Sequence, residues 1–260
     1  MKKILTELLI LIGIGGLLWA AFAFFIKMPE KPEIISPELE QILGEKYKDA
    51  ILSLNGFTKI ETSGIDSILS LDSEKLSDHF GSSRYNFKIT LVRNDMVNAF
   101  ALPAGNIIIT TGLVNFCESS DELFAVLSHE AGHIADRHII SRLVKNLGIT
   151  ILTSDNKSVT GEIAKRVIST GYDRKQEEEA DHSACEILEK AGVEPYILAS
   201  FFRRLKEVSG QEIFSKFEIL FSHPNLDKRI RNVLSYNTGS DFKSFENKPD
   251  IQVLKNMIQD

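Results

Sequence analysis

The sequence contains little cysteine, no excess of basic residues, no internal repeat and no low-complexity tract. Its two cysteines, Cys117 and Cys185, could pair in an oxidising compartment, but two cysteines define no disulfide framework. We expect Cys185 to pack inward as a small apolar residue instead. A net charge of −6 argues against a nucleic-acid-binding surface. The 260 residues, 43% of them hydrophobic, are enough for one domain of moderate size plus appendages.

Long apolar stretches are also scarce, and only the N-terminal part of the chain contains one. Residues 8–26 form a run of 19 residues without a charge, preceded by two lysines, and this run is long enough to cross a bilayer as a helix. We therefore predict an uncleaved membrane anchor at 1–27 and a linker at 28–36, with the rest of the chain outside the cytoplasm. The alternative is secretion after cleavage of a signal peptide near 21–23.

The remaining sequence predicts a mostly helical α+β domain. Apolar residues at helical spacing, together with capping residues, indicate helices at about 37–50, 64–80, 119–147, 159–191, 195–208 and 224–236. Short β-rich runs indicate strands at 87–92, 97–102 and 106–110, the first two joined at 94–95. The domain then covers 37–240, and 241–260 form a C-terminal tail.

The most informative stretch is an HExxH motif at 129–133, within the helix predicted at 119–147. Residues four apart lie one above the other on a helix, so His129 and His133 can hold one metal ion from a single face. Glu130 is rotated by about a quarter turn, which allows it to act as a general base rather than a ligand. The alternative is a helix with two ordinary histidines. We expect His138 to point elsewhere, because it lies about 180° around the helix from His129.

A third ligand is needed, because a catalytic zinc usually has three protein ligands and one open position. The metzincin pattern is excluded, since Asp136 and Ile139 stand where its glycine and third histidine would be. Glu177 and Asp181 are four residues apart and share a helix face. One carboxylate can bind zinc while the other accepts a ring N–H from a ligand histidine. The alternative is a solvated acidic helix start.

Taken together, these segments resemble metallopeptidase family 48, which consists of gluzincin peptidases. The likeness covers most of residues 86–236. Besides the HExxH motif at 129–133 and the ExxxD element at 177–181, it includes 98–105 with 107–113, the segment 191–195, and the late His-Pro element at 222–224 followed by Arg229. The visible departure is Ala104, where many members have a second glycine; it puts none of the chemistry in doubt.

The resemblance implies a zincin-type domain with a small β-sheet beside the zinc helix and one Zn²⁺ per chain. It assigns Glu177 as the third metal ligand, Glu130 as the general base and Asp181 as the carboxylate outside the ligands. His223 is the candidate oxyanion donor; as an alternative, it occupies the open zinc position and restrains activity. Arg229 is expected near the ligands as a supporting residue, or as a second oxyanion donor.

The function implied is that of a zinc metalloendopeptidase tethered to a bacterial inner membrane, facing the periplasm and hydrolysing unfolded or misassembled polypeptides. Two alternatives remain open. One is a latent protease that works as a metal-binding chaperone or adaptor in envelope protein assembly. The other is an enzyme that hydrolyses a non-peptide amide. The intact Glu130 argues against an inactive enzyme.

Substrate binding is expected at the edge of the sheet, because extended substrates of zincins commonly add a strand there. Either 98–102 or 106–110 supplies that edge, and Asn98, Ala99 and Phe100 are the candidate substrate-binding residues. The alternative is a core hairpin turned at 103–105.

Overall fold

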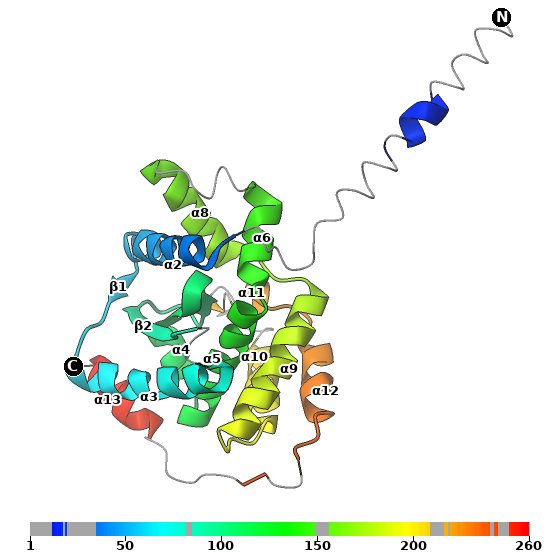
Figure 1. Cartoon of the computed structure of the whole chain (residues 1–260). Coiled ribbons are helices and arrows are strands. Elements are labelled where there is room, and N and C mark those ends of the chain that lie inside the picture. Colours follow the sequence, from blue (N-terminus) through cyan, green and yellow to red (C-terminus); the bar gives the residue numbers. More distant parts are fainter. Residues whose placement is uncertain are drawn as a thin grey trace, which may run out of the picture.

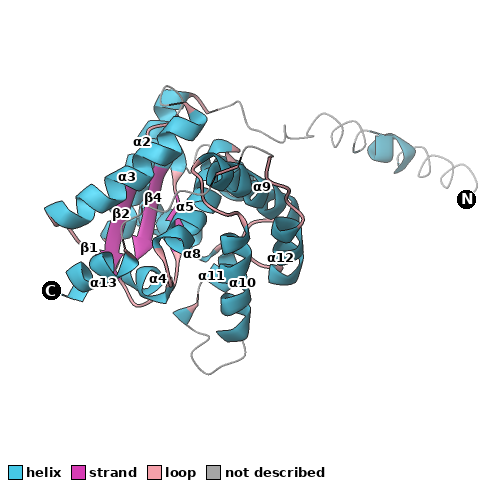
Figure 2. Cartoon of the chain, turned by 90° about the horizontal axis from the view of Figure 1, so that it is seen from below, coloured by secondary structure: helices cyan, strands magenta, loops and turns pink. Residues whose placement is uncertain are grey.

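In the computed structural model the described residues are 12–17, 19, 35–81, 85–148, 156–208, 216–217, 219–239, 242–243 and 250–259. The strands are β1 (Thr58–Lys59), β2 (Lys88–Arg93), β3 (Ala99–Ala101) and β4 (Asn106–Thr110). The helices are α2 (Pro37–Leu52), α3 (Ser63–Phe80), α4 (Thr111–Phe116), α5 (Ser120–Ala135), α6 (His138–Leu147), α8 (Lys157–Ser169), α9 (Arg174–Lys190), α10 (Tyr196–Val208), α11 (Ile219–Ser222), α12 (Leu226–Leu234) and α13 (Ile251–Gln259). The fold is therefore mostly helical α+β with one small mixed sheet (Figure 2).

The sheet has the strand order β1-β2-β4-β3. Strand β4 pairs in parallel with β2 and antiparallel with β3, and all five of its residues are buried. A continuous apolar run is typical of such a central strand. The two strands joined at 94–95 are therefore not neighbours, because β4 lies between them. This order also rules out β4 as the edge strand and leaves that position to β3.

The helices pack around the sheet on both sides. In Figure 1 the strands lie between α2 above and α3 below, and α9 lies between α5 and α12. Helix α2 begins at Pro37 after Ser36, whose side chain accepts the N–H of Leu39 and caps the helix. Helix α5 contacts β3, β4 and α9, so it connects the sheet to the C-terminal helices.

Two of the predicted helices are broken. The helix predicted at 119–147 ends at Ala135, and α6 starts at His138 after Arg137 has adopted a left-handed conformation with φ 57°. Such a conformation costs about 1–3 kcal/mol for a non-glycine residue. The Arg137 guanidinium offsets this cost: its Nη2 donates to the backbone oxygen of Ile35 at 2.7 Å and lies 3.0 Å from Glu40 Oε2. Tertiary contacts thus override the helical periodicity.

The helix predicted at 159–191 is interrupted at 170–173, where α8 ends and α9 begins. Asp173 caps α9, and its side chain and that of Gln176 form a capping box. This break places Tyr172 in a loop and lets α9 start at the angle that brings its acidic face to α5.

Glu40 of α2 also reaches the turn between β3 and β4. Its Oε1 accepts the backbone N–H of Ala104 at 3.4 Å, and Ala104 has φ 59°. One buried carboxylate therefore contacts two residues with left-handed backbone, Ala104 and Arg137.

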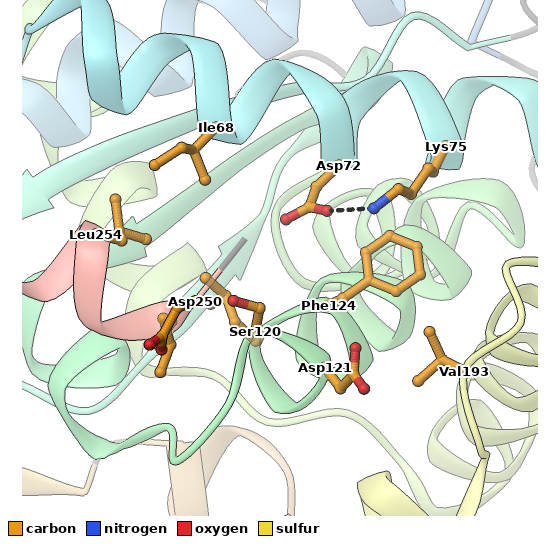
Figure 3. A pocket seen from close by; sticks show the side chains of 11 residues that line it. Ile68, Asp72, Lys75, Ser120, Asp121, Phe124, Val193, Asp250 and Leu254 are labelled. Atoms are coloured by element: carbon orange, nitrogen blue, oxygen red, sulfur yellow. Dashed lines mark hydrogen bonds and ion pairs between the residues drawn. The ribbon is translucent and has the colours of Figure 1, made fainter. Parts of the chain in front are cut away.

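Helix α13 packs against α3 and α4. Ile251, Leu254 and Ile258 are buried, and Lys255 donates to the backbone oxygen of Cys117 at 2.7 Å. Figure 3 shows the small cavity between α3, α5 and α13, about 20 Å³ in volume, with an ion pair of 3.3 Å between Asp72 and Lys75. This volume holds about one water molecule.

Both cysteines are buried and unpaired, as expected for Cys185. Most of the predicted anchor and linker lies outside the described residues. Within the part of the chain that is described, no helix has the length and apolar character needed to span a bilayer.

Candidate metal centre

Four buried side chains from three parts of the chain converge on one point. They are His129 and His133 of α5, Glu177 of α9, and His223, which directly follows α11. One donor atom from each lies within 4.8 Å of all the others. The Nε2 atoms of the two α5 histidines are 3.1 Å apart. The structure therefore brings together the three predicted ligands, His129, His133 and Glu177. It also places His223, the predicted oxyanion donor or occupant of the open zinc position, beside them.

Close packing of α5 on α9 produces this convergence. Gly132 lies between His129 and His133 on α5, and a Cβ atom there would approach the backbone oxygen and Cα of Ala180 at 3.0 and 3.1 Å. The absence of a side chain lets the two helices come near enough for Glu177 to reach the histidines. Glycine at this position therefore sets the spacing of the site.

Replacing Gly132 with valine is expected to destabilise the protein by about 1–3 kcal/mol and to weaken metal binding, because the added atoms push α9 away from α5. Urea unfolding and a metal competition titration would measure both effects. Gly161→Val is the matched control, since a Cβ at this helical glycine has nothing within 4 Å. Equal losses in the two variants would contradict the role of close packing.

His129 is held by a carboxylate and an arginine. Its Nδ1 lies 3.0 Å from Asp181 Oδ1, which leaves Nε2 directed at the other donors. Arg229 donates through Nε and Nη2 to Asp181, at 2.9 and 2.6 Å, and its Nη1 lies 2.7 Å from Glu177 Oε2. The guanidinium also lies over the Phe202 ring, 4.0 Å from its centroid. Arg229 thus connects the two carboxylates that the sequence paired.

The charge of Arg229 governs the ionisation of both carboxylates. Burial alone would raise the pKa of Glu177, but Arg229 and His223 outweigh it and the pKa lies well below its ordinary value. Burial opposes ionisation of Asp181 too, and Arg229 and His129 bring its pKa below the ordinary value. Both side chains are therefore anions at neutral pH, which is the form that binds a cation.

His133 has a different environment. Its ring stacks on Tyr172, with centroids 3.6 Å apart and planes at 12°, and the Arg142 guanidinium lies 4.3 Å from the Tyr172 centroid. Burial holds the pKa of His133 well below its ordinary value, so the ring is neutral and keeps a lone pair for a metal. Sequence reasoning missed Tyr172 and Arg142, because neither belongs to a recognisable motif.

His138 does not point away from the site, contrary to our prediction. Its Nδ1 lies 2.9 Å from Nδ1 of His133, and its Nε2 lies 3.0 Å from Glu179 Oε2. The prediction was wrong because it assumed one continuous helix through 138, whereas the left-handed Arg137 turns the chain back. His138 is outside the group of four donors.

Glu130 lies between the sheet and His223. Its Oε2 accepts the N–H of Ala101 at 3.0 Å, and its Oε1 is 3.4 Å from Nε2 of His223. Near the start of β3, Asn98 is fully buried; its Oδ1 accepts the N–H of Ala99, while its Nδ2 has no hydrogen-bond partner among the described residues. The general-base candidate is thus hydrogen-bonded to the edge strand itself.

The segment that carries His223 also touches this edge. Val97 donates to the backbone oxygen of Lys216 at 2.7 Å and accepts the N–H of Ile219 at 3.4 Å. The cavity beside His129 and His223 has a volume of only about 10 Å³ and is walled by side chains of α10 and α12. All four donor residues are buried, so the site is closed off by the part of the chain that the structure describes.

The donor set suits a transition metal. Imidazole nitrogens and a carboxylate oxygen are the ligands that zinc takes in catalytic sites, and here they are buried, close together and oriented by neighbouring groups. The residues could therefore hold one divalent ion.

Comparison with known proteins gives the family. The model of peptidase family M48 matches residues 69–237, which include all the donor residues. This chain belongs to peptidase family M48. Its members are metallopeptidases, which need a metal, and the cluster of His129, His133, Glu177 and His223 could hold one.

Several known proteins are similar to part of this chain. The mitochondrial metalloendopeptidase OMA1 of Arabidopsis thaliana is 30% identical over 151 residues, 56% of this chain and 30% of the relative. The beta-barrel assembly-enhancing protease of Yersinia pestis is 27% identical over 175 residues, 60% of this chain and 35% of the relative. The metalloprotease LoiP of Escherichia coli is 26% identical over 169 residues, 61% of this chain and 65% of the relative. The match spans only about a third of the first two relatives.

Proposed function

We propose that this M48 metallopeptidase is a zinc-dependent endopeptidase that cleaves unfolded or misassembled polypeptides outside the cytoplasm of a bacterium. The observation that carries the proposal is the convergence of three imidazoles and Glu177 beside Glu130 and an edge strand. The relatives named as metalloendopeptidases, and the one named for assembly of β-barrels, support the substrate class.

In this proposal His129, His133 and Glu177 hold one Zn²⁺. When bound, the ion would polarise a peptide carbonyl and lower the pKa of water to about 7. Glu130 takes the proton of the attacking water at Oε1 and passes it to the nitrogen of the departing amine. Asp181 holds the ring of His129, and Arg229 holds the carboxylate of Glu177, so that both side chains keep their metal-binding atoms in place.

The experiment uses the full-length chain purified in a mild detergent. Unfolded casein should be cleaved, and the same protein treated with a chelator should be inactive until zinc is returned. A tightly folded substrate should resist. Stoichiometric zinc without any cleavage, in this protein and in the His223 variant below, would instead favour the alternative of a metal-binding chaperone or adaptor.

His223 is proposed as a fourth donor that closes the site and must leave when substrate enters. Its Nδ1 lies 3.0 Å from Glu177 Oε1 and 3.2 Å from His129 Nε2, among the donor atoms. His223 and the other three donors are buried, so a peptide can reach them only if the segment that carries His223 moves.

Replacing His223 with alanine is therefore expected to raise kcat/KM for an unfolded peptide about tenfold, which corresponds to about 1.4 kcal/mol. A continuous assay with a quenched fluorescent peptide measures it. His182→Ala, at an exposed position on α9, is the control. A fall of about 10²–10³-fold would show instead that His223 stabilises the oxyanion.

Substrate is proposed to add a strand to the outer edge of β3, where Asn98, Ala99 and Phe100 would contact it. The support is the buried Nδ2 of Asn98, which would donate to the substrate backbone. A buried donor without a partner costs about 1–3 kcal/mol, and its removal offsets the loss of the hydrogen bond from the N–H of Ala99 to Asn98 Oδ1, so the free protein should lose little stability.

For Asn98→Ala we expect KM to rise about tenfold, or about 1.4 kcal/mol, with little change in thermal stability. Steady-state kinetics on the same peptide and a thermal melt test this. An unchanged KM would contradict the assignment of the edge strand.

The location is part of the same proposal. The charge-free run at 8–26 supports a single-pass anchor in a bacterial inner membrane, with 37–240 facing the periplasm. Resistance to carbonate extraction, together with digestion of the domain by protease added to spheroplasts, would support it. Recovery of a shortened chain in the medium would favour secretion after signal cleavage.

A further inference from the structure

The ring of His133 is tied to a carboxylate at the protein surface through a second histidine. Nδ1 of His133 lies 2.9 Å from Nδ1 of His138, whose Nε2 lies 3.0 Å from Glu179 Oε2. We propose that His138 and Glu179 are positioning residues that fix the tautomer and orientation of His133 for metal binding. The inference rests on the metal site of the proposed function.

The direction of the hydrogen bonds follows from the carboxylate. A carboxylate only accepts, so a neutral His138 donates from Nε2–H to Glu179 and its Nδ1 carries a lone pair. That lone pair accepts Nδ1–H of His133. His133 is then protonated on Nδ1 and keeps the lone pair of Nε2, the atom that lies 3.1 Å from Nε2 of His129. The chain of three residues therefore selects the tautomer that a metal requires.

The arrangement gives each ligand histidine its own support. Asp181 and Arg229 hold His129 from α9 and α12, whereas His133 has no carboxylate in direct contact with its Nδ1 among the described residues. His138 is buried and occupies that position, and it extends the link to Glu179, whose side chain is 41% exposed. The break of the helix at Arg137 is what brings His138 there.

The stack with Tyr172 restrains a different degree of freedom. Tyr172 lies parallel to the plane of His133 and limits tilting, but a stacked ring cannot choose which nitrogen is protonated. Only a hydrogen bond in the plane of the ring makes that choice. His138 and Tyr172 therefore have separable effects.

The test compares two substitutions at 138 in the full-length protein. His138→Leu removes the acceptor, and zinc affinity, measured by competition with a chromophoric chelator, should fall about 10–100-fold. His138→Asn places an amide oxygen near the position of Nδ1 and should recover affinity to within about fivefold of the unsubstituted protein. The absorption spectrum of the cobalt-loaded protein should be altered in the first variant and restored in the second.

Two substitutions at the protein surface test the inference even if the variants at the buried position 138 fold poorly. Glu179→Ala should weaken zinc binding several-fold, whereas Glu178→Ala should not, because Glu178 is ion-paired with Lys228. Thermal melts of the metal-free proteins check that both remain folded. Equal affinity in the two alanine variants, or equal loss in His138→Leu and His138→Asn, would overturn the inference. Absence of zinc binding by the unsubstituted protein would overturn the proposed function itself.

Discussion

Replacing Glu130 with glutamine is expected to lower kcat for peptide hydrolysis by about 10²–10⁴-fold while zinc remains bound. The size of the effect is that of a lost general base, since an amide cannot take the proton of the attacking water. Glu130 is not among the four convergent donors, so the metal should stay. The amide oxygen of glutamine can still accept the N–H of Ala101, so the fold should be unchanged.

Three quantities are measured on the same preparation: the rate of casein cleavage, the zinc content of the purified protein and its thermal stability. Glu122→Gln is an unsuitable control, because Glu122 is ion-paired with Arg204 in the core. Glu178→Gln is suitable, since that side chain lies at the surface. Full activity of Glu130→Gln would contradict the assignment of the base, and loss of zinc would indicate a structural role instead.

Replacing Arg229 with methionine is expected to destabilise the metal-free protein by about 3–5 kcal/mol, because it leaves two buried carboxylates without a counter-charge. Glu177 and Asp181 are each at most 2% exposed, and Arg229 is ion-paired with both. Bound zinc would supply part of the missing positive charge. The loss of stability should therefore be smaller in the zinc-loaded variant than in the metal-free one.

The pairing of Arg229 with Glu177 and Asp181 also makes the free energy of unfolding depend on pH. The pKa values of Glu177 and Asp181 are depressed in the folded protein, so their contribution to stability is present at neutral pH and is lost as the pH falls below about 4. Without Arg229 both pKa values rise, and the difference in stability between the two proteins should shrink on acidification. Urea unfolding at several pH values measures it, with the exposed Arg231→Met on the same helix as control. A difference that does not vary with pH or zinc would contradict the charge-pairing account.

The sequence predicted which residues come together better than it predicted their surroundings. Spacing alone placed His129 and His133 on one helix face and put Glu177 and Asp181 together on another, whereas the family resemblance implied that Glu177 is the ligand and Asp181 its support. Their mutual approach depends on packing of α5 against α9, which no spacing rule specifies. The contact exists because Gly132 has no side chain, a reason that is visible only once Ala180 is known to lie opposite.

The failures have a common physical cause. Helical periodicity ran without interruption through 119–147, but Arg137 leaves the helix because Glu40 and Ile35, about 100 residues earlier, bind its guanidinium. Strands β2 and β3 follow each other in the chain, but the sheet places β4 between them. In both cases contacts with residues far away in the sequence determine the structure, and local sequence patterns contain no information about those contacts.

The contacts of Glu40 extend the packing around the site beyond the region of the family match. The family match starts at residue 69, whereas Glu40 and Ile35 lie well before it and hold Arg137, on which the placement of His138 depends. A fragment cut at the family boundary would keep the four convergent donors and Glu130. It would nevertheless lack Glu40 and Ile35, which bind Arg137 in the turn after α5, so we expect that turn, and with it the position of His138, to be less well defined in the fragment.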